Sequence, residues 1–103
     1  MIILKNHNEM EKIHHLDEQV KNSISEDLKI LDDNYGTDRD MSDWGGFVAI
    51  IETDDDVEIL NKLYYLNINE DIPEYADNLN RYIKKLFIVG SEYAITVYIP
   101  KYG

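Results

Sequence analysis

The chain has 103 residues, of which 44% are apolar and 30% are charged, and it contains no cysteine. This length predicts one domain with a modest core, and the lack of cysteine excludes disulfides and thiolate metal sites. The net charge of −11 at pH 7 disfavours direct binding to DNA, RNA or anionic lipid, because phosphates are repelled. The apolar runs are far shorter than the roughly 18 residues of a membrane span, so we expect a soluble, cytoplasmic protein.

The N-terminal third carries a helical pattern. Asn8 and Glu11 have the spacing of a capping box, and residues 34–36 end in a glycine that is typical of a helix end. The polar stretch 22–27 leaves open a restart of the helix at that point. Apolar residues recur every three or four positions, which predicts one buried helical face. That face consists of Ile13, Leu16, Val20, Ile24, Leu28 and Leu31.

The middle of the chain changes from polar to apolar. Residues 37–46 are rich in aspartate and end in two glycines, which predicts an exposed loop. Residues 47–51 are apolar at every position, which predicts a strand that is covered on both faces. We therefore expect this strand to lie at the centre of a sheet.

A second, shorter helix is predicted after this strand. Thr53 is placed to cap it, and three aspartates follow in the first turn, where the helix dipole stabilises acids. Its expected apolar stripe consists of Val57, Leu60, Leu63 and Tyr64. Residues 67–77 contain Pro73, and we expect them to be irregular.

The C-terminal part has the pattern of a β-hairpin. Residues 81–89 and 93–99 are rich in β-branched and aromatic side chains, and Gly90-Ser91 between them suits a tight turn. We predict an α+β domain with a mainly antiparallel sheet of about three strands, packed against the long N-terminal helix and the second short helix. Residues 1–5 are a candidate for a further short edge strand. If the last strand lies at an edge, its unpaired backbone groups offer a route to a homodimer.

Acidic residues are concentrated in the middle of the sequence. Residues 32–77 hold fourteen acids against Arg39 and Lys62. Such acids can simply keep a small domain soluble. Alternatively, fixed carboxylates imitate the phosphates of a nucleic acid and bind the basic groove of a nuclease or DNA-binding protein, with exposed aromatic residues as anchors. The predicted partner-binding residues are Asp32, Asp33, Tyr35, Asp38, Asp40, Asp43, Trp44, Asp54, Asp55, Asp56, Glu58, Glu70 and Asp71.

Aromatic residues divide into two groups by their surroundings. Tyr65 and Tyr75, like the anchors above, fall beside acids in or near predicted loops, which is typical of interface residues. Tyr82, Tyr93 and Tyr98 belong to the predicted hairpin, where a tyrosine can bury its ring and keep its hydroxyl near water.

Metal binding and catalysis have weaker signals. His14 and Glu18 have the four-residue spacing of two ligands on one helical turn, but no third ligand is evident. A calcium loop that starts at Asp38 fails, because its sixth and twelfth positions hold Asp43 and Ala49 instead of Gly and Glu. No nucleophile elbow or phosphate-binding glycine loop is present. We therefore expect neither a cofactor nor a metal nor an enzyme, with a small metal-binding enzyme as an alternative.

Two stretches carry a resemblance. The segment Leu31-Asp-Asp-Asn-Tyr-Gly36, with Asp38-Arg-Asp40 and Gly45-Gly46-Phe-Val after it, resembles uncharacterised small proteins of phages and mobile elements of low-GC Gram-positive bacteria. The later Ile72-Pro-Glu-Tyr75 is similar to the same group. Size and charge are similar to those of anti-restriction and anti-CRISPR proteins that mimic DNA. The resemblance implies an inhibitor of a host defence nuclease. An immunity protein that neutralises a cationic toxin is the alternative.

Overall fold

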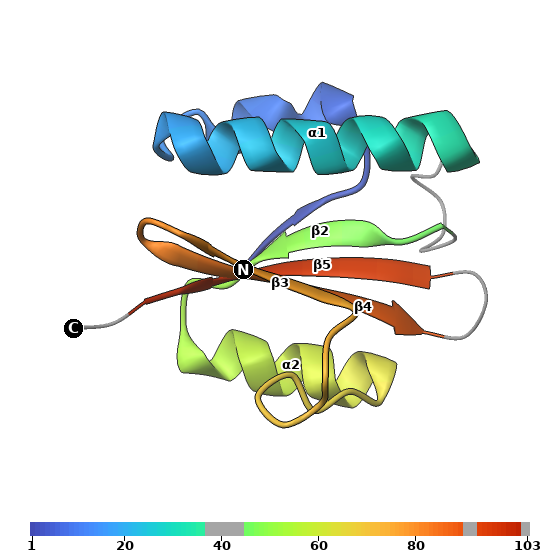
Figure 1. Ribbon diagram of the computed structural model, residues 1–103, viewed down its shortest axis with the longest axis vertical. Helices are drawn as coiled ribbons and strands as arrows, with labels where there is room; N and C mark the ends of the chain where they lie inside the picture. The colour runs from blue at the N-terminus through green and yellow to red at the C-terminus, as the bar shows by residue number, and fades with distance from the viewer. Residues whose placement is uncertain (37–44, 90–92, 102–103) are drawn as a thin grey trace.

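The computed structural model describes residues 1–36, 45–89 and 93–101, apart from the side chain of Tyr93. These residues form an α+β fold in which helices cover both faces of a mixed five-stranded sheet (Figure 1). The elements in chain order are β1 (Ile2–Leu4), the 3-10 helix η1 (His7–Ile13), α1 (Glu18–Tyr35), β2 (Phe47–Ile50), α2 (Asp54–Tyr64), β3 (Tyr75–Leu79), β4 (Tyr82–Val89) and β5 (Tyr93–Pro100).

The sheet has the strand order β1-β2-β5-β4-β3. Its β4–β5 hairpin and its β1 edge strand were predicted, but the prediction of three mainly antiparallel strands is only partly right. β2 and β5 run parallel, while the other neighbouring pairs are antiparallel. The central strand is β5 and not β2. Because β5 is paired on both sides, the condition for a homodimer through an unpaired last strand is not met.

Strand β3 begins inside residues 67–77, which were predicted to be irregular, and extends two residues beyond them. It pairs with the outer side of β4, from Tyr75 opposite Leu86 to Leu79 opposite Tyr82. Four of its five residues are exposed, so its sequence lacks the apolar alternation of a half-buried strand. Pairing with β4, rather than burial of its side chains, holds this edge strand in place.

Two hydrophobic cores lie on opposite faces of the sheet. Along β2, Val48 and Ile50 face the core under α1, whereas Phe47 and Ala49 face the core over α2. Strand β5 alternates in the same way, with Tyr98 on the α1 side and Ile95, Val97 and Ile99 on the α2 side. The predicted burial of residues 47–51 on both faces is therefore confirmed.

The N-terminal helical pattern contains two helices. η1 ends at Ile13, and α1 begins at Glu18 after the N-cap Asp17, whose side chain accepts a hydrogen bond from the Val20 N–H (3.0 Å). The break therefore lies near residues 14–17, and α1 continues through residues 22–27. Five residues of the predicted face are buried and Leu16 is half-buried. As predicted, Gly36 ends α1.

Helix α2 begins as predicted. Thr53 and Asp56 form a capping box, in which each side chain accepts a hydrogen bond from the backbone N–H of the other residue. Leu60 is buried and Val57 and Tyr64 are half-buried against the sheet. Leu63 is 63% exposed, so its assignment to the buried stripe is wrong.

The entry to β2 requires a glycine. Gly46 has φ +101°, and a Cβ atom there would overlap the backbone carbonyl of Ala94 in the neighbouring strand β5. A side chain at this position would force the two parallel strands apart.

Among the described residues, no helix is both long and apolar enough to cross a membrane.

Candidate functional site

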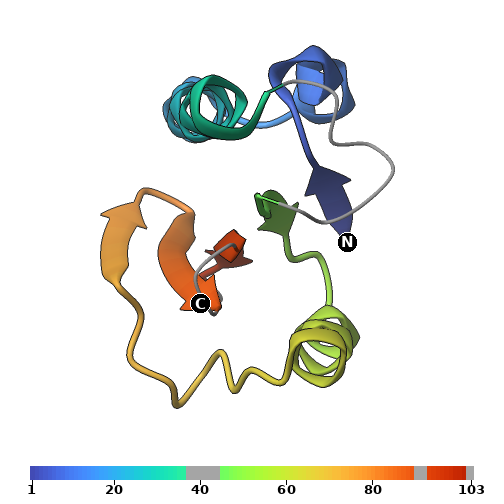
Figure 2. The same cartoon turned by 90° about the vertical axis from the view of Figure 1, so that its right-hand side faces the viewer.

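The predicted acidic site residues do not lie on one surface. Asp32 and Asp33 are at the C-terminal end of α1, on one side of the sheet, whereas Asp54, Asp55 and Glu58 are on α2, on the other side (Figure 1). The segment that carries Glu70 and Asp71 runs along the α2 side as well, as both views show (Figure 2). Asp38, Asp40, Asp43 and Trp44 lie outside the described residues.

Asp56 has a structural contact instead of an exposed position. It is 7% exposed, and its carboxylate accepts hydrogen bonds from the N–H groups of Glu52 (2.9 Å) and Thr53 (3.0 Å). The Met1 ammonium also lies 3.1 Å from it. Burial raises the pKa of Asp56, but the hydrogen bonds and this ammonium outweigh burial and hold the pKa below its usual value. Asp56 therefore stabilises the start of α2 and offers little surface to a partner.

Two other predicted residues are also engaged within the fold. The Asp32 carboxylate accepts a hydrogen bond from the His7 N–H (3.1 Å), which connects α1 to η1. Tyr35 is half-buried, packs against the core under α1 and lies against Gly45. Asp33 is exposed at the end of α1.

Three of the remaining predicted acids share helix α2 with exposed apolar side chains. Asp54, Asp55 and Glu58 are exposed, and Ile59 and Leu63, one helical turn apart, are 46% and 63% exposed. Tyr65, which follows the helix in a left-handed conformation (φ 55°), is 95% exposed. We call this surface the α2 face, and it consists of Asp54, Asp55, Glu58, Ile59, Lys62, Leu63 and Tyr65.

The loop after α2 extends the same side of the molecule. Glu70 and Asp71 are exposed, and Asn67 donates a hydrogen bond to each of them. Its side-chain amide donates to the Glu70 carboxylate (2.9 Å), and its backbone N–H donates to the Asp71 carboxylate (2.7 Å). Ile72 beside them is 94% exposed. The loop therefore repeats the composition of the α2 face, with carboxylates next to an exposed aliphatic side chain.

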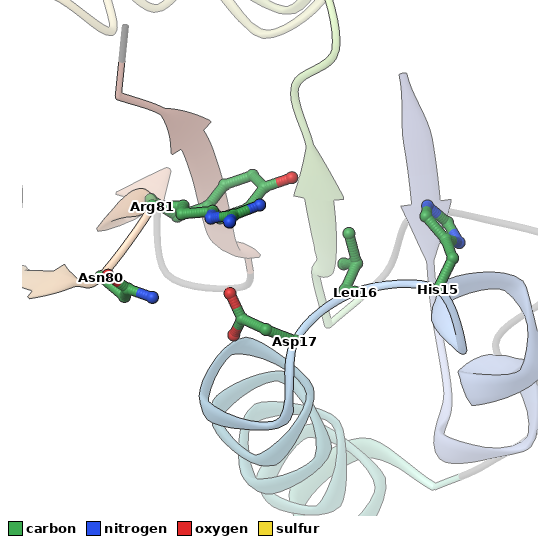
Figure 3. A pocket seen from close by; sticks show the side chains of 6 residues that line it. His15, Leu16, Asp17, Asn80 and Arg81 are labelled. Carbon is green, nitrogen blue, oxygen red and sulfur yellow. The ribbon is translucent and has the colours of Figure 1, made fainter. Parts of the chain in front are cut away.

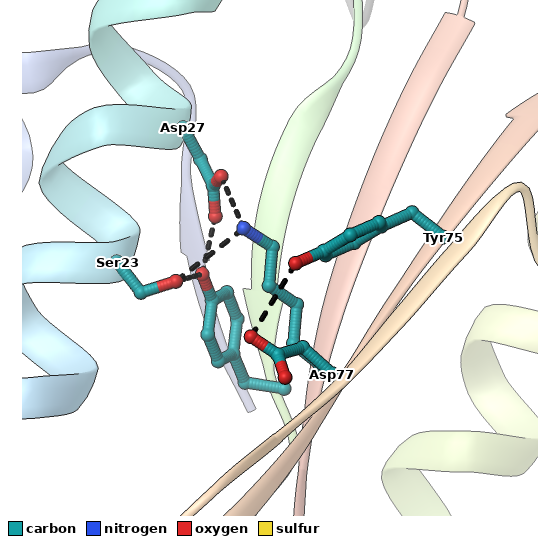
Figure 4. Close-up of polar contacts among 6 residues, drawn as sticks. Ser23, Asp27, Tyr75 and Asp77 are labelled. Carbon is teal, nitrogen blue, oxygen red and sulfur yellow. Dashed lines mark hydrogen bonds and ion pairs between the residues drawn. The ribbon is translucent and has the colours of Figure 1, made fainter.

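A buried polar cluster under α1 escaped prediction. The Lys84 ammonium lies 2.6 Å from the Asp27 carboxylate, which also accepts a hydrogen bond from the Tyr98 hydroxyl. Ser23 lies 2.7 Å from that hydroxyl and accepts a longer hydrogen bond from Lys84 (Figure 4). We call these four residues the Asp27 cluster. It joins α1 to β4 and β5.

The Asp27 cluster has altered proton affinities. Burial raises the pKa of Asp27, and the hydrogen bonds from Lys84 and Tyr98 offset this only in part. Burial and the nearby Asp27 charge also raise the pKa of the Tyr98 hydroxyl. The Tyr98 hydroxyl therefore stays protonated and donates a hydrogen bond to the Asp27 carboxylate. Since Lys84 is held by a carboxylate, the cluster has the form of a structural contact rather than of an activated nucleophile.

Tyr75 differs from its prediction as a loop anchor. It lies in β3, is 50% exposed, and its hydroxyl donates a weak hydrogen bond to Asp77 (3.4 Å) (Figure 4). The Lys84 ammonium lies 5.5 Å from the centre of its ring, within the range of a cation–π contact. The ring of Tyr75 therefore borders the Asp27 cluster.

His14 and Glu18, which have the sequence spacing of two metal ligands, do not share a helix. His14 lies in the turn before α1, where its Nδ1 contacts the Glu11 carbonyl (2.9 Å), whereas Glu18 is in α1 and pairs with Lys21 (2.9 Å). The two residues are therefore not on one helical turn. Within the part of the chain that the structure describes, no group of three or more His, Asp and Glu side chains is placed to hold a metal ion.

No protein-family description, curated protein or solved structure matches this chain.

Proposed function

We propose that the protein is an acidic inhibitor, of the kind carried by phages or mobile elements, that uses the α2 face to cover the nucleic-acid groove of a basic partner. The observation that carries this proposal is the combination on one helix of exposed Ile59 and Leu63 with exposed Asp55 and Glu58. Protein interfaces commonly place apolar anchors inside a polar rim.

The two kinds of side chain contribute at different steps of binding. Carboxylates accelerate the encounter with a basic surface, and this effect weakens as salt screens the charges. Apolar side chains that leave water on binding lengthen the residence time. Both contributions are available on the α2 face without unfolding, because Ile59 and Leu63 are outside the two cores.

Charge favours a basic partner. Residues 45–79 hold nine acids and a single lysine, Lys62. A groove that binds nucleic acid concentrates positive charge, because its lysine and arginine side chains neutralise the phosphates. A host defence nuclease is therefore the first class of partner to test. Of the acids predicted to bind a partner, the proposal keeps the exposed ones on the α2 side of the sheet. A cationic toxin would also need an acidic surface such as the α2 face, but its binding does not require that the surface imitate DNA.

The proposal is tested by affinity capture with two matched double variants. Glu58→Gln with Leu63→Ser changes the α2 face, and Glu26→Gln with Ile30→Ser makes the same changes on α1, where Ile30 is 58% exposed. The tagged wild type and both variants are incubated with bacterial lysate at about 50 and 500 mM salt, a range over which screening of exposed charges increases strongly.

We expect wild type and the α1 variant to capture the same basic nucleic-acid-binding protein at low salt, and duplex DNA to displace it. The α2 variant should lose it. Equal capture by both variants, or capture by none, would contradict the proposal. Capture of a basic toxin that DNA does not displace would contradict mimicry and favour the immunity protein.

A further inference from the structure

A cleft lies at one edge of the sheet, between the start of α1 and the β3–β4 turn. β2 and β5 are parallel, so their carboxyl ends meet at this edge, where Ile50 pairs with Ile2 and Pro100 pairs with Tyr82. Two adjoining cavities of about 310 and 280 Å³ occupy it and share His15, Leu16 and Tyr82 in their walls. Carboxyl ends of parallel strands are a common place for ligands in sheets that carry helices on both faces.

The two cavities differ in chemistry. One is lined mainly by apolar residues at or next to strand ends, Ile2, Ile50, Ile51 and Pro100. Its acid, Glu52, is already in contact with the Met1 ammonium (2.6 Å). This half of the cleft therefore suits an aliphatic group.

The other cavity is lined by charged and polar side chains. Arg81 comes from the β3–β4 turn and Asp17 from the start of α1, and Figure 3 shows the Asp17 carboxylate directed toward Arg81 across the opening. Over the described residues, neither side chain takes part in an ion pair, and the N-terminal cap of α1 engages one Asp17 oxygen, Oδ1. A guanidinium and a carboxylate thus face one small space without joining.

We propose that this cleft binds a free α-amino acid with an aliphatic side chain. Arg81 would bind the ligand carboxylate, for which a guanidinium offers two parallel N–H donors. Asp17 would accept hydrogen bonds from the ligand ammonium. The side chain would enter the apolar cavity beside Ile50 and Pro100. Opposite charges at one end and an apolar wall at the other match such a zwitterion better than a simple anion or a simple amine.

The test is an NMR titration of the full ¹⁵N-labelled chain with three probes. These are L-leucine, 4-methylpentanoate, which lacks the ammonium, and 3-methylbutylamine, which lacks the carboxylate. Each is added up to about 10 mM, ten times a weak dissociation constant of 1 mM. We expect leucine to shift the amide signals of Leu16, Ile51 and Tyr82. Each analogue should bind roughly tenfold more weakly or worse, since a charged hydrogen bond is lost.

Variants then assign each contact to its residue. Arg81→Gln should weaken leucine binding roughly tenfold or more and remove the preference for leucine over 3-methylbutylamine. Asp17→Ser, which keeps a good helix cap, should remove the preference for leucine over 4-methylpentanoate. Lys29→Gln, exposed on α1 and outside both cavities, is the control and should bind leucine like wild type. Unshifted cleft amides, or equal binding of leucine and 4-methylpentanoate to wild type, would overturn the proposal.

Discussion

At the scale of single residues, the Asp27 cluster joins α1 to the sheet through polar contacts. Asp27 and Lys84 are 12% and 15% exposed, and they belong to elements far apart in the sequence. A buried ion pair adds little net stability relative to apolar residues, but removing one partner leaves the other without compensation. The cluster therefore fixes how α1 sits on β4 and β5 more than it increases the free energy of unfolding.

Asp27→Asn is expected to lower the free energy of unfolding by about 1 to 3 kcal/mol at pH 7, because the amide keeps one accepting oxygen for the two donors Lys84 and Tyr98 and its NH₂ group faces one of them. Burial raises the pKa of Asp27 in the folded state, so the folded chain binds this proton more tightly than the unfolded chain, whose Asp pKa is about 3.9. Wild type thus gains stability from this group as pH falls through the folded pKa, and the variant does not.

Urea denaturation of both proteins at pH 7 and near pH 4 measures this difference. We expect the deficit of Asp27→Asn to be larger at the lower pH. Asp33→Asn, exposed on the same helix, should change stability by less than about 0.5 kcal/mol at pH 7. A deficit of Asp27→Asn that shrinks on acidification would contradict the assignment.

At the scale of elements, the start of α1 decides how the N-terminal third is divided. Asp17 caps α1 through its bond to the Val20 N–H. Asp17→Ala should lower the free energy of unfolding by about 1 kcal/mol, whereas Asp17→Ser should leave it nearly unchanged, because serine also caps helices well. Thermal unfolding of both variants measures this, and equal losses for Ala and Ser would show that the carboxylate charge matters rather than the cap.

The sequence predicted those elements in which buried residues recur at a regular spacing or form a continuous apolar run. The buried residues of α1 recur every three or four positions, and residues 47–51 are apolar throughout, so each pattern indicates its element directly. Strand β3 has no such pattern, because four of its residues face solvent and β4 supplies its pairing. Leu63 fits a helical spacing but is 63% exposed, because α2 turns Val57, Leu60 and Tyr64 toward the core instead.

At the scale of the whole molecule, charge is spread over both helical layers. The net charge of −11 implies self-repulsion in the compact state, which added salt screens. We expect sodium chloride between about 50 and 500 mM to raise the midpoint of thermal unfolding by a few degrees, since about 1 kcal/mol corresponds to roughly 4 to 8 °C for a domain of this size. Potassium chloride should act equally. A falling midpoint would show that screened ion pairs outweigh the repulsion.

The candidate site could be predicted only in part. The exposed acids of α2 and its following loop could be identified from composition, but their separation from Asp32 and Asp33 follows from the two helices lying on opposite faces of the sheet. The cleft depends on the strand order, which brings Arg81 and Asp17 together from turns far apart in the chain. Neither arrangement leaves a periodic signal in the sequence.

The central position of β5 has a consequence for how the chain is made. Both layers need this strand, because Tyr98 belongs to the core under α1 and Ile95 and Val97 belong to the core over α2. Parallel pairing of β5 with β2 joins segments about half the chain apart, and such distant contacts form slowly. A ribosome therefore has to release residues 93–100 before either core can close, and until then β2 exposes apolar side chains on both sides. During this interval β2 is accessible to chaperones that bind exposed apolar segments.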